Sequence, residues 1–424
     1  MIPGSASKKL LKQLRQYESP HVTYGDADFP VFIRSAKGCR VTDVDGNSYL
    51  DLTAFFAVCG LGHGAPVVRR AAEAVLKRGW HAMGDVHPHE LKLEAARAVA
   101  SVLPKPLKQV WFSCNGSDAV ETALKTAYLY TGKPGVLAFE GSYHGLGYGA
   151  LQVTSRAFFR EPFAGQGGAF GEFAPFPMEG AVTRAEADRQ LSAIRKRLMS
   201  ASPRRIGAVI VEPIQGRAGV RPIDPYFLTK LARIVRAAKA LLIFDEIYSG
   251  FCRTGKWFAF EHYGVTPDLI CLGKGMSNGF PISACVSSSK IFAAWGPSPG
   301  EARHTSTFLG HPMGCAMTSA TIGHLKLGQW DVRARETGEY FRRQLCQLVL
   351  KKPRAAAGVR GRGLMLGLVL KQPGAAAQLM KQCLKKGIIL LPSGEKSNIV
   401  SFSPSFIISK AQIKTAVDQI ISLI

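Results

Sequence analysis

The sequence predicts an α/β protein built around a largely parallel β-sheet, accompanied by a smaller α+β unit. From about residue 66, short apolar runs of the buried-strand type alternate with helical patterns over roughly 250 residues. This alternation is typical of parallel sheets covered by helices. The chain has 424 residues, which is more than one ordinary hydrophobic core contains, so a second structural unit is expected.

The elements of the larger unit follow one another along the chain. Apolar and polar side chains alternate over residues 39–51 around Asp45–Asn47, which predicts a β-hairpin. Helices are expected at 66–78, 90–102 and 118–130. A short strand at 110–112 leads through a glycine-containing turn into the third of these helices. Further buried strands are expected at 136–139, 206–211 and 241–244.

The last third of the chain predicts the smaller unit. Long helical patterns resume after about residue 320, and residues 363–370 and 388–391 are expected to form strands. Residues 163–180, rich in Gly, Phe and Pro, are expected to form a loop over a site. We therefore divide the chain into three parts. Residues 1–54 are the N-terminal part of a small domain, 55–322 a large cofactor-binding domain, and 323–424 the C-terminal small domain.

Composition narrows the classes of function. The net charge is +24, yet the basic residues are scattered and no aromatic-interleaved stripe accompanies them, so no nucleic-acid partner is predicted. A basic surface would instead attract anionic substrates and cofactors. No apolar run is long enough to span a membrane, and no membrane partner is predicted. Nine irregularly spaced cysteines without a Cys-x-x-Cys pair indicate a reducing compartment, which predicts a cytoplasmic protein without a metal site.

Lys274 is the residue whose surroundings point most clearly to chemistry. It lies between two glycines, 29 positions after Asp245, and Asp245 itself closes the apolar run 240–244. A lysine of this kind can form a Schiff base, and a buried aspartate can keep the nitrogen of a pyridine ring protonated. Taken alone, a lysine in a glycine-rich loop is more often a solvated surface residue, and the other motifs of the chain reverse this interpretation.

Two further segments suggest a phosphate-bearing, planar cofactor. Residues 113–119 follow a strand and open a helix, where free N–H groups and the positive end of the helix dipole can hold a phosphate. A Gly-Ser turn before a helix is also an ordinary N-cap. Tyr143 follows a second strand and could stack on a ring, although packing in the core is the alternative.

These motifs and their order resemble the class III aminotransferases over essentially the whole chain. That family includes ornithine, acetylornithine and 4-aminobutyrate aminotransferases and glutamate-1-semialdehyde aminomutase. The motifs that carry the resemblance are Asp43–Asn47, Gly60–His63, Asn115–Ala119, Tyr143–Gly145, Glu212–Gly216, Asp245–Glu246, Gly273–Gly275, Ser306–Pro312 and Arg360–Gly363. The resemblance implies the pyridoxal-phosphate aminotransferase fold (fold type I), with a seven-stranded sheet, and pyridoxal 5'-phosphate as cofactor.

The resemblance also implies a role for particular residues. Lys274 would form the Schiff base with the cofactor and then carry the proton between the substrate Cα and the cofactor. Asp245 would pair with the pyridine nitrogen, and Gly116 and Ser117 would hold the phosphate.

Further cofactor contacts are implied around the ring. Tyr143 would stack on its face next to His144, and Glu212 would orient its hydroxyl side. Tyr248 stands where many members have a Gln that bonds the ring hydroxyl. Thr307 would reach the phosphate of a neighbouring subunit's cofactor, which makes a homodimer with a shared active site part of the expectation. Arg253 matches a basic position that the family uses structurally.

Two departures bear on the substrate. Many members clamp the substrate carboxylate with an Arg in a Leu-Arg-Phe-x-Pro motif, but Ser401 stands at that position here. The Glu that gates this Arg is replaced by Arg217. Arg217 either binds an anionic group at a new place or simply faces solvent or another subunit.

The expected function is therefore amino-group transfer between an amine or amino acid and a carbonyl acceptor. The two departures favour an amine of the ω-amino or amino-aldehyde type. An aminomutase like the glutamate-1-semialdehyde enzyme and a lyase on the same scaffold remain open, because the cofactor stabilises the same carbanion in each. A non-catalytic regulatory relative is the remote alternative, and the presence of both Lys274 and Asp245 counts against it.

Overall fold

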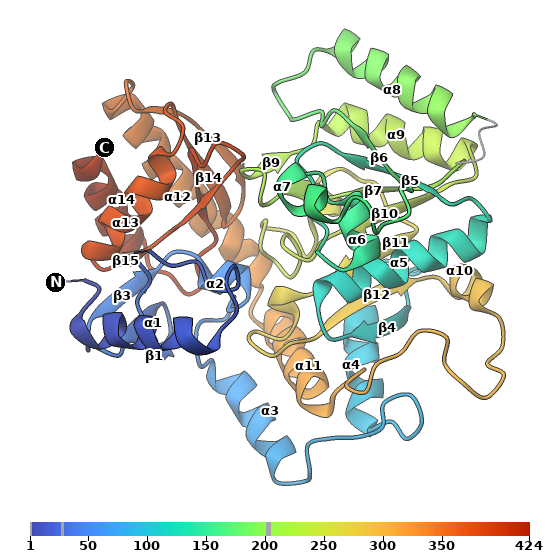
Figure 1. Ribbon diagram of the computed structural model, residues 1–424, viewed down its shortest axis with the longest axis horizontal. Helices are drawn as coiled ribbons and strands as arrows, with labels where there is room; N and C mark the ends of the chain where they lie inside the picture. The colour runs from blue at the N-terminus through green and yellow to red at the C-terminus, as the bar shows by residue number, and fades with distance from the viewer. Residues whose placement is uncertain (1, 27–28, 201–204) are drawn as a thin grey trace.

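The computed structural model describes residues 2–26, 29–200 and 205–424. Its centre is a seven-stranded sheet in the order β4-β12-β11-β10-β7-β5-β6 (Figure 1). The strands are β4 (Gln109–Ser113), β5 (Gly135–Phe139), β6 (Gly171–Ala174), β7 (Ile206–Val211), β10 (Leu241–Asp245), β11 (Leu269–Leu272) and β12 (Ser283–Ser287). Strand β12 is antiparallel to both neighbours, and the pairings from β11 to β6 are parallel. The predicted α/β fold class is confirmed.

Helices cover both faces of this sheet, because alternate side chains of each strand point to opposite sides. In β7, Ala208 and Ile210 pack with α5, whereas Val209 and Val211 belong to the core that contains α9. Every residue of the central strands β7 and β10 is buried, as expected for a sheet covered on both faces. Along the whole chain, the α-helices other than the short α2 are α1 (Ser5–Tyr17), α3 (Pro66–Leu76), α4 (Glu90–Ala100), α5 (Gly116–Thr131), α6 (Tyr148–Val153), α7 (Ala157–Arg160), α8 (Arg184–Leu198), α9 (Pro225–Ala237), α10 (Ser289–Phe292), α11 (Pro312–Leu327), α12 (Trp330–Lys351), α13 (Ala375–Lys385) and α14 (Lys410–Leu423).

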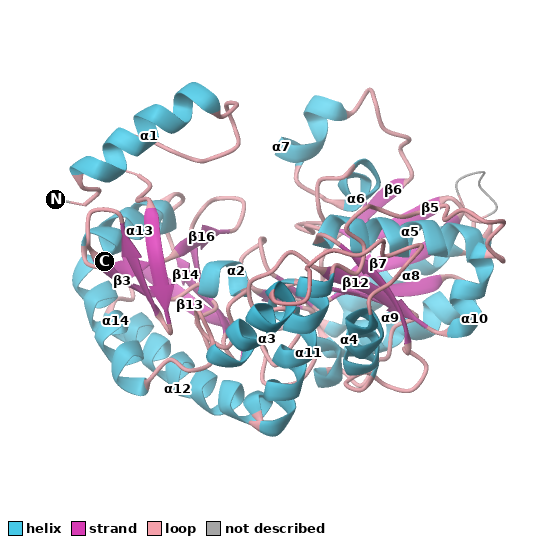
Figure 2. Cartoon of the chain, turned by 90° about the horizontal axis from the view of Figure 1, so that it is seen from below, coloured by secondary structure: helices cyan, strands magenta, loops and turns pink. Residues whose placement is uncertain are grey.

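Two four-stranded sheets lie beside the large sheet. One has the order β1-β2-β3-β15 and the other β13-β14-β17-β16. Their strands are β1 (Ile33–Lys37), β2 (Arg40–Asp43), β3 (Ser48–Asp51), β13 (Ala356–Arg362), β14 (Met365–Leu370), β15 (Ile388–Ile389), β16 (Leu391–Ser393) and β17 (Ile399–Phe402). The N-terminal strands thus pack next to C-terminal elements, and both chain ends lie on this side of the molecule (Figure 1). Figure 2 shows α2 (Ala54–Ala57), α3 and α11 between the two groups of strands.

Several sequence expectations hold, and two need correction. The hairpin around Asp45–Asn47 forms between β2 and β3. Residues 163–180 are not loop throughout, because Gly171–Ala174 forms strand β6 at the edge of the large sheet. The run 388–391 is not one strand: β15 pairs with β3, whereas β16 pairs with β17 in a different sheet. Among the described residues, no helix is long and apolar enough to cross a membrane.

Candidate active site

The carboxyl ends of the sheet strands surround a cavity of about 620 Å³. Asp245 ends β10, Lys274 follows β11, and Glu212 follows β7. Parallel strands bring their carboxyl ends to one edge of a sheet, so residues far apart in sequence meet there. All the site residues expected from sequence line this cavity except Thr307. They are Gly116, Ser117, Tyr143, His144, Glu212, Arg217, Asp245, Tyr248 and Lys274.

Asp245 is fixed by donors on both of its oxygens. Its Oδ1 accepts the backbone N–H of Ile247 at 3.1 Å, and its Oδ2 accepts a hydrogen bond from His144 Nδ1 at 2.8 Å. The His144 side chain is buried, and its Nε2 has no hydrogen-bond partner among the described residues. Asp245 is thus a carboxylate in a fixed orientation at the cavity wall.

Lys274 is half-buried in the cavity wall and has an uncommon backbone conformation. Its φ is 44°, in the left-handed region that side chains other than glycine seldom adopt. Its Nζ lies 4.9 Å from the centre of the Tyr248 ring. Burial lowers the pKa of Lys274, the carboxylates of Asp245 and Glu212 oppose this shift, and the charge of Arg217 adds to it. A lowered pKa favours the neutral amine, which is the form that can take a proton.

Glu212 joins two loops of the site. Its Oε1 accepts the backbone N–H of Tyr143 at 3.0 Å, and its Oε2 accepts that of Gly216 at 2.9 Å. Burial raises the pKa of Glu212 to about 7. Its carboxyl group therefore sets the position of Tyr143 and of the loop that carries Arg217.

The start of α5 also lines the cavity. The Asn115 side chain caps the helix by accepting the Asp118 N–H at 3.1 Å, and Gly116 and Ser117 follow as the first helical residues. The N-terminus of a 16-residue helix offers unpaired N–H groups and a positive dipole end. A Cβ at Gly116 would lie 2.8 Å from Ile247 Cδ1, so glycine allows the start of α5 to pack closely against Ile247.

Sequence reasoning missed the apolar part of the wall that contains Phe56 and Val58. Four consecutive residues, Ala54–Ala57, have φ between 43° and 66°, and they form the left-handed turn α2. The turn is held by the Asp51 carboxylate, which bonds Thr53 and lies 2.8 Å from His63 Nε2. None of these four residues is glycine, so no sequence signal marks a left-handed segment here.

Tyr248 and Ser401 do not offer free polar groups to the cavity. The Tyr248 hydroxyl lies 3.2 Å from Ser403 Oγ, so its ring rather than its hydroxyl faces Lys274. Ser401 lies in β17 with its hydroxyl 2.5 Å from that of Ser393, and it does not line the cavity. This wall therefore lacks the bidentate carboxylate clamp that an arginine at 401 would supply.

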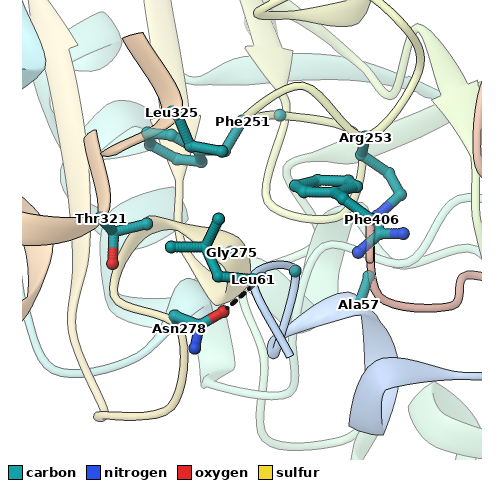
Figure 3. A pocket seen from close by; sticks show the side chains of 11 residues that line it. Ala57, Leu61, Phe251, Arg253, Gly275, Asn278, Thr321, Leu325 and Phe406 are labelled. Carbon is teal, nitrogen blue, oxygen red and sulfur yellow. Dashed lines mark hydrogen bonds between the residues drawn. The ribbon is translucent and has the colours of Figure 1, made fainter. Parts of the chain in front are cut away.

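A separate narrow void, which has no room for a water molecule, is lined by Gly275 next to Lys274 and by Arg253 (Figure 3). Arg253 is fully buried there; its Nη1 donates to the carbonyl oxygens of Leu364 and Pro404, and its Cζ lies 4.6 Å from the Phe406 ring centre. Across the void, Asn278 Oδ1 accepts the Leu61 N–H at 2.7 Å. Asn278 thus links the segment after Lys274 to the N-terminal part of the chain, and Arg253 links the loop after β10 to the C-terminal part. Neither residue lines the cavity itself.

Comparison with known proteins identifies the family. Residues 22–424 match the family model for class III aminotransferases. The chain belongs to this family. It is 38% identical to the acetylornithine aminotransferase of Methanopyrus kandleri over 339 residues, which cover 80% of each chain. It is 33% identical to the putrescine aminotransferase of Pectobacterium atrosepticum over 376 residues, which are 85% of this chain and 77% of that one.

Solved aminotransferase structures share the fold. An (S)-enantioselective omega-transaminase from Thermomicrobium roseum superposes with a TM-score of 0.88 at 26% identity, covering 97% of both chains. A more distant omega-transaminase from Pseudomonas jessenii, 22% identical, was solved in complex with PMP. Class III aminotransferases use pyridoxal phosphate, and this chain is a pyridoxal-phosphate-dependent aminotransferase.

The cavity of this aminotransferase fits that cofactor. Its volume admits a molecule of this size, and the start of α5 supplies N–H groups on one side while the Asp245 carboxylate stands on another.

Proposed function

We propose that this aminotransferase takes its amino group from an amine of the ω-amino or amino-aldehyde type and passes it to a carbonyl acceptor. The observation that carries the proposal is the presence of Lys274 and a fixed Asp245 carboxylate in one cavity. The relatives named for acetylornithine and putrescine also support an amino group at the end of a chain. So does the absence of an arginine at 401.

We propose the following positions around the cofactor. Gly116 and Ser117 would hold the phosphate, Asp245 would pair with the pyridine nitrogen while His144 bonds its Oδ2, and Tyr143 would stack on the ring. A carboxylate next to the ring nitrogen favours its protonated form. Glu212 acts on the cofactor indirectly, because it holds the backbone of Tyr143. When bound, pyridoxal phosphate supplies an electron sink that stabilises negative charge on the substrate carbon.

The chain itself supplies the proton transfer. With the cofactor bound, Lys274 Nζ would take the proton from the substrate carbon that bears the amino group and deliver it to the cofactor, which then keeps the amino group when the carbonyl product leaves. This role needs a neutral amine near neutral pH, and burial lowers the pKa of Lys274 in that direction. Tyr248 lies under Nζ and limits its movement to the cavity side.

A homodimer is the proposed assembly. Thr307 is exposed and does not line the cavity of its own chain, which leaves its hydroxyl for a partner's site. Near it, His81 lies 5.4 Å from the Phe308 ring, and Trp80, Met83, Val86 and Phe308 are each more than half exposed. An apolar cluster of this kind favours contact with another protein surface.

A cytoplasmic location is also proposed, because all nine cysteines lie among the described residues as free thiols.

The absorption spectrum of the purified protein with pyridoxal phosphate tests the proposed function. A competent amine should convert the visible band of the bound cofactor into the shorter-wavelength band of pyridoxamine phosphate, with release of the carbonyl product. Lys274→Ala should abolish turnover, because it removes the only proposed proton carrier. Lys256→Ala, which changes an exposed lysine outside the cavity, is the matched control.

Two results would change the conclusion. Near-normal turnover by Lys274→Ala would contradict the proposed role of Lys274. A visible band that no amine discharges, from a protein that still converts an amino-aldehyde or releases ammonia, would favour the aminomutase or the lyase.

A further inference from the structure

Arg217 is a cavity-lining cation on a fixed loop. It follows Gly216 between β8 (Ile214–Gln215) and β9 (Arg221–Pro222). The loop is anchored from the large sheet, where Glu212 accepts the Gly216 N–H at 2.9 Å. It is also anchored from the C-terminal part, where the Gly394 N–H donates to the Arg217 carbonyl at 2.9 Å. The backbone of Arg217 is thus held from both sides, and its exposed side chain lines the cavity.

The guanidinium of Arg217 lies over two aromatic rings, and its N–H donors have no protein partner among the described residues. Its Cζ lies 4.8 Å from the centre of the Tyr143 ring and 5.6 Å from that of Phe159. Stacking uses the face of the guanidinium, whereas its N–H donors point outward in the plane. Among the described residues, no carboxylate lies within 4.0 Å of Arg217, and no hydrogen bond of its side chain is formed. The edge that could bind a planar oxyanion in a bidentate way is therefore unused.

The other charged groups of the cavity have their own partners. The Asp245 carboxylate is bonded by His144 and by the Ile247 N–H, and the Glu212 carboxylate by two backbone N–H groups. Among the described residues that line the cavity, Lys274 and Arg217 are the only lysine or arginine side chains. Lys274 is assigned to the reacting carbon, so Arg217 is the remaining cation that a substrate can meet.

We propose that Arg217 binds an anionic group at the end of the substrate remote from the reacting carbon, so that acidic amines and acidic carbonyl compounds are the preferred substrates. The anion is a carboxylate or another oxyanion such as a phosphonate. This proposal rests on the proposed function for the location of the reacting carbon. Binding of the anion does not depend on turnover, so the anion-binding role of Arg217 and the proposed amino transfer can each fail without the other.

Equilibrium binding of unreactive probes to the cofactor-loaded protein tests the proposal. Pentanoate and its neutral isostere pentanamide isolate the charge, and butylphosphonate compares a second oxyanion, each measured by titration calorimetry or saturation-transfer NMR. Arg217→Met should weaken pentanoate or butylphosphonate binding by about ten- to a hundredfold and bring it close to that of pentanamide. Arg217→Lys should fall between, because it keeps the charge but not the planar fork.

Arg156→Met is the matched control. Arg156 also stacks on Phe159, at 5.4 Å, but it does not line the cavity. We expect the affinity of the Arg156→Met protein for each probe to stay within about twofold of the wild-type affinity. Three results would each overturn the proposal. The first is equal anion affinity in wild type and Arg217→Met, and the second is no anion binding by wild type. The third is loss of pyridoxal phosphate from the Arg217 variants. The last result would place Arg217 on the cofactor instead.

Kinetics give an independent second readout. The ratio of kcat/KM for 4-aminobutyrate to that for butylamine should fall at least tenfold in Arg217→Met relative to wild type. An unchanged ratio would contradict the proposal even if both rates fall, because a general loss of folding or cofactor affects both amines alike.

Discussion

At the residue scale, the two adjacent acids Asp245 and Glu246 have opposite environments. Asp245 faces the cavity, whereas Glu246 is fully buried on the other side of the chain. Glu246 Oε1 accepts the Phe260 N–H at 2.7 Å, and its Oε2 accepts the Ala259 N–H at 3.0 Å and a hydrogen bond from the Ser249 hydroxyl. Burial raises the pKa of Glu246 to about 7 despite these donors. Glu246 therefore holds the turn after β10 together without taking part in the cavity.

This raised pKa makes part of the stability depend on pH. A carboxyl group with a pKa raised in the folded state binds its proton more tightly there than in the unfolded chain. Its contribution is complete below the unfolded value of 4.5 and is lost as the pH rises through about 7. We expect the stability advantage of wild type over Glu246→Gln to shrink by on the order of 3 kcal/mol between pH 5 and pH 8. Urea unfolding of both proteins without cofactor measures this difference. A gap that widens with pH would show that Glu246 is stabilised as the carboxylate.

Sequence identified the polar residues of the site better than its apolar ones. Lys274 and Asp245 stand in motifs that follow one another along the chain in the order of the family. Schiff-base formation and pairing with a ring nitrogen also restrict which residue types can occupy these two positions. Phe56 enters the cavity only because the backbone of Ala54–Ala57 is left-handed. That conformation is imposed by the Asp51 network and by packing, such as the contact of Phe55 with His63 at 4.5 Å between ring centres. Local propensity favours the opposite conformation, so sequence could not predict it.

At the element scale, tertiary pairing decides what an apolar run becomes. Ile388 and Ile389 pair with β3 from the N-terminal segment, and Leu391 begins a strand in another sheet. Nothing within 388–391 marks the break, since it depends on partners that are distant in sequence. Strand β6 has a glycine and a glutamate among four residues, so it lacks the β-branched composition of a buried strand. As an edge strand it pairs, among the described residues, with β5 alone.

Helix packing gives a test at this scale, because two helical glycines differ in their surroundings. A Cβ at Gly338 in α12 would lie 2.1 Å from the Gly363 carbonyl oxygen, whereas nothing lies within 4 Å of one at Gly323 in α11. Helix propensity alone favours Ala at both positions by about 1 kcal/mol. We expect Gly323→Ala to stabilise by about 0.5–1 kcal/mol and Gly338→Ala to destabilise by about 1–3 kcal/mol, measured by urea unfolding.

The comparison of the two variants separates propensity from packing. Equal stabilisation by both substitutions would mean that α12 can move away from the β13–β14 turn at little cost. The opposite signs that we expect would establish that glycine at 338 is required for the close approach of this helix to Gly363.

At the scale of the whole molecule, the N-terminal strands complete a sheet with β15 near the C-terminus. The boundaries that we proposed at 54/55 and 322/323 remain a prediction, and this sheet supports joining residues 1–54 to the C-terminal part. Contacts across the parts include the ion pair of Arg362 with Glu179, at 2.7 Å, and the bond of Gly394 to Arg217. The cavity therefore depends on how these parts sit together. Sequence patterns give the strands and helices but not this arrangement.

The proposed homodimer makes a prediction about which chain supplies Thr307 to each site. Thr307→Ala should weaken cofactor binding by about tenfold or more, since it removes a hydroxyl that we place on a charged phosphate. Thr305→Ala is the control, because the Thr305 hydroxyl bonds Asp85 of its own chain at 2.8 Å. Differently tagged Lys274→Ala and Thr307→Ala chains can then be co-expressed and purified as a mixed dimer.

If Thr307 acts on the partner's cofactor, one site of the mixed dimer combines an intact Lys274 with an intact Thr307 from the other chain, and the second site carries both lesions. The mixed dimer should then recover about half of the wild-type activity per dimer, with kinetics like those of wild type. If Thr307 acts within its own chain, each site carries one lesion, and activity stays at the level of the two parent proteins. The exposed position of Thr307 outside its own cavity favours the first result, and an inactive mixed dimer would contradict the shared site.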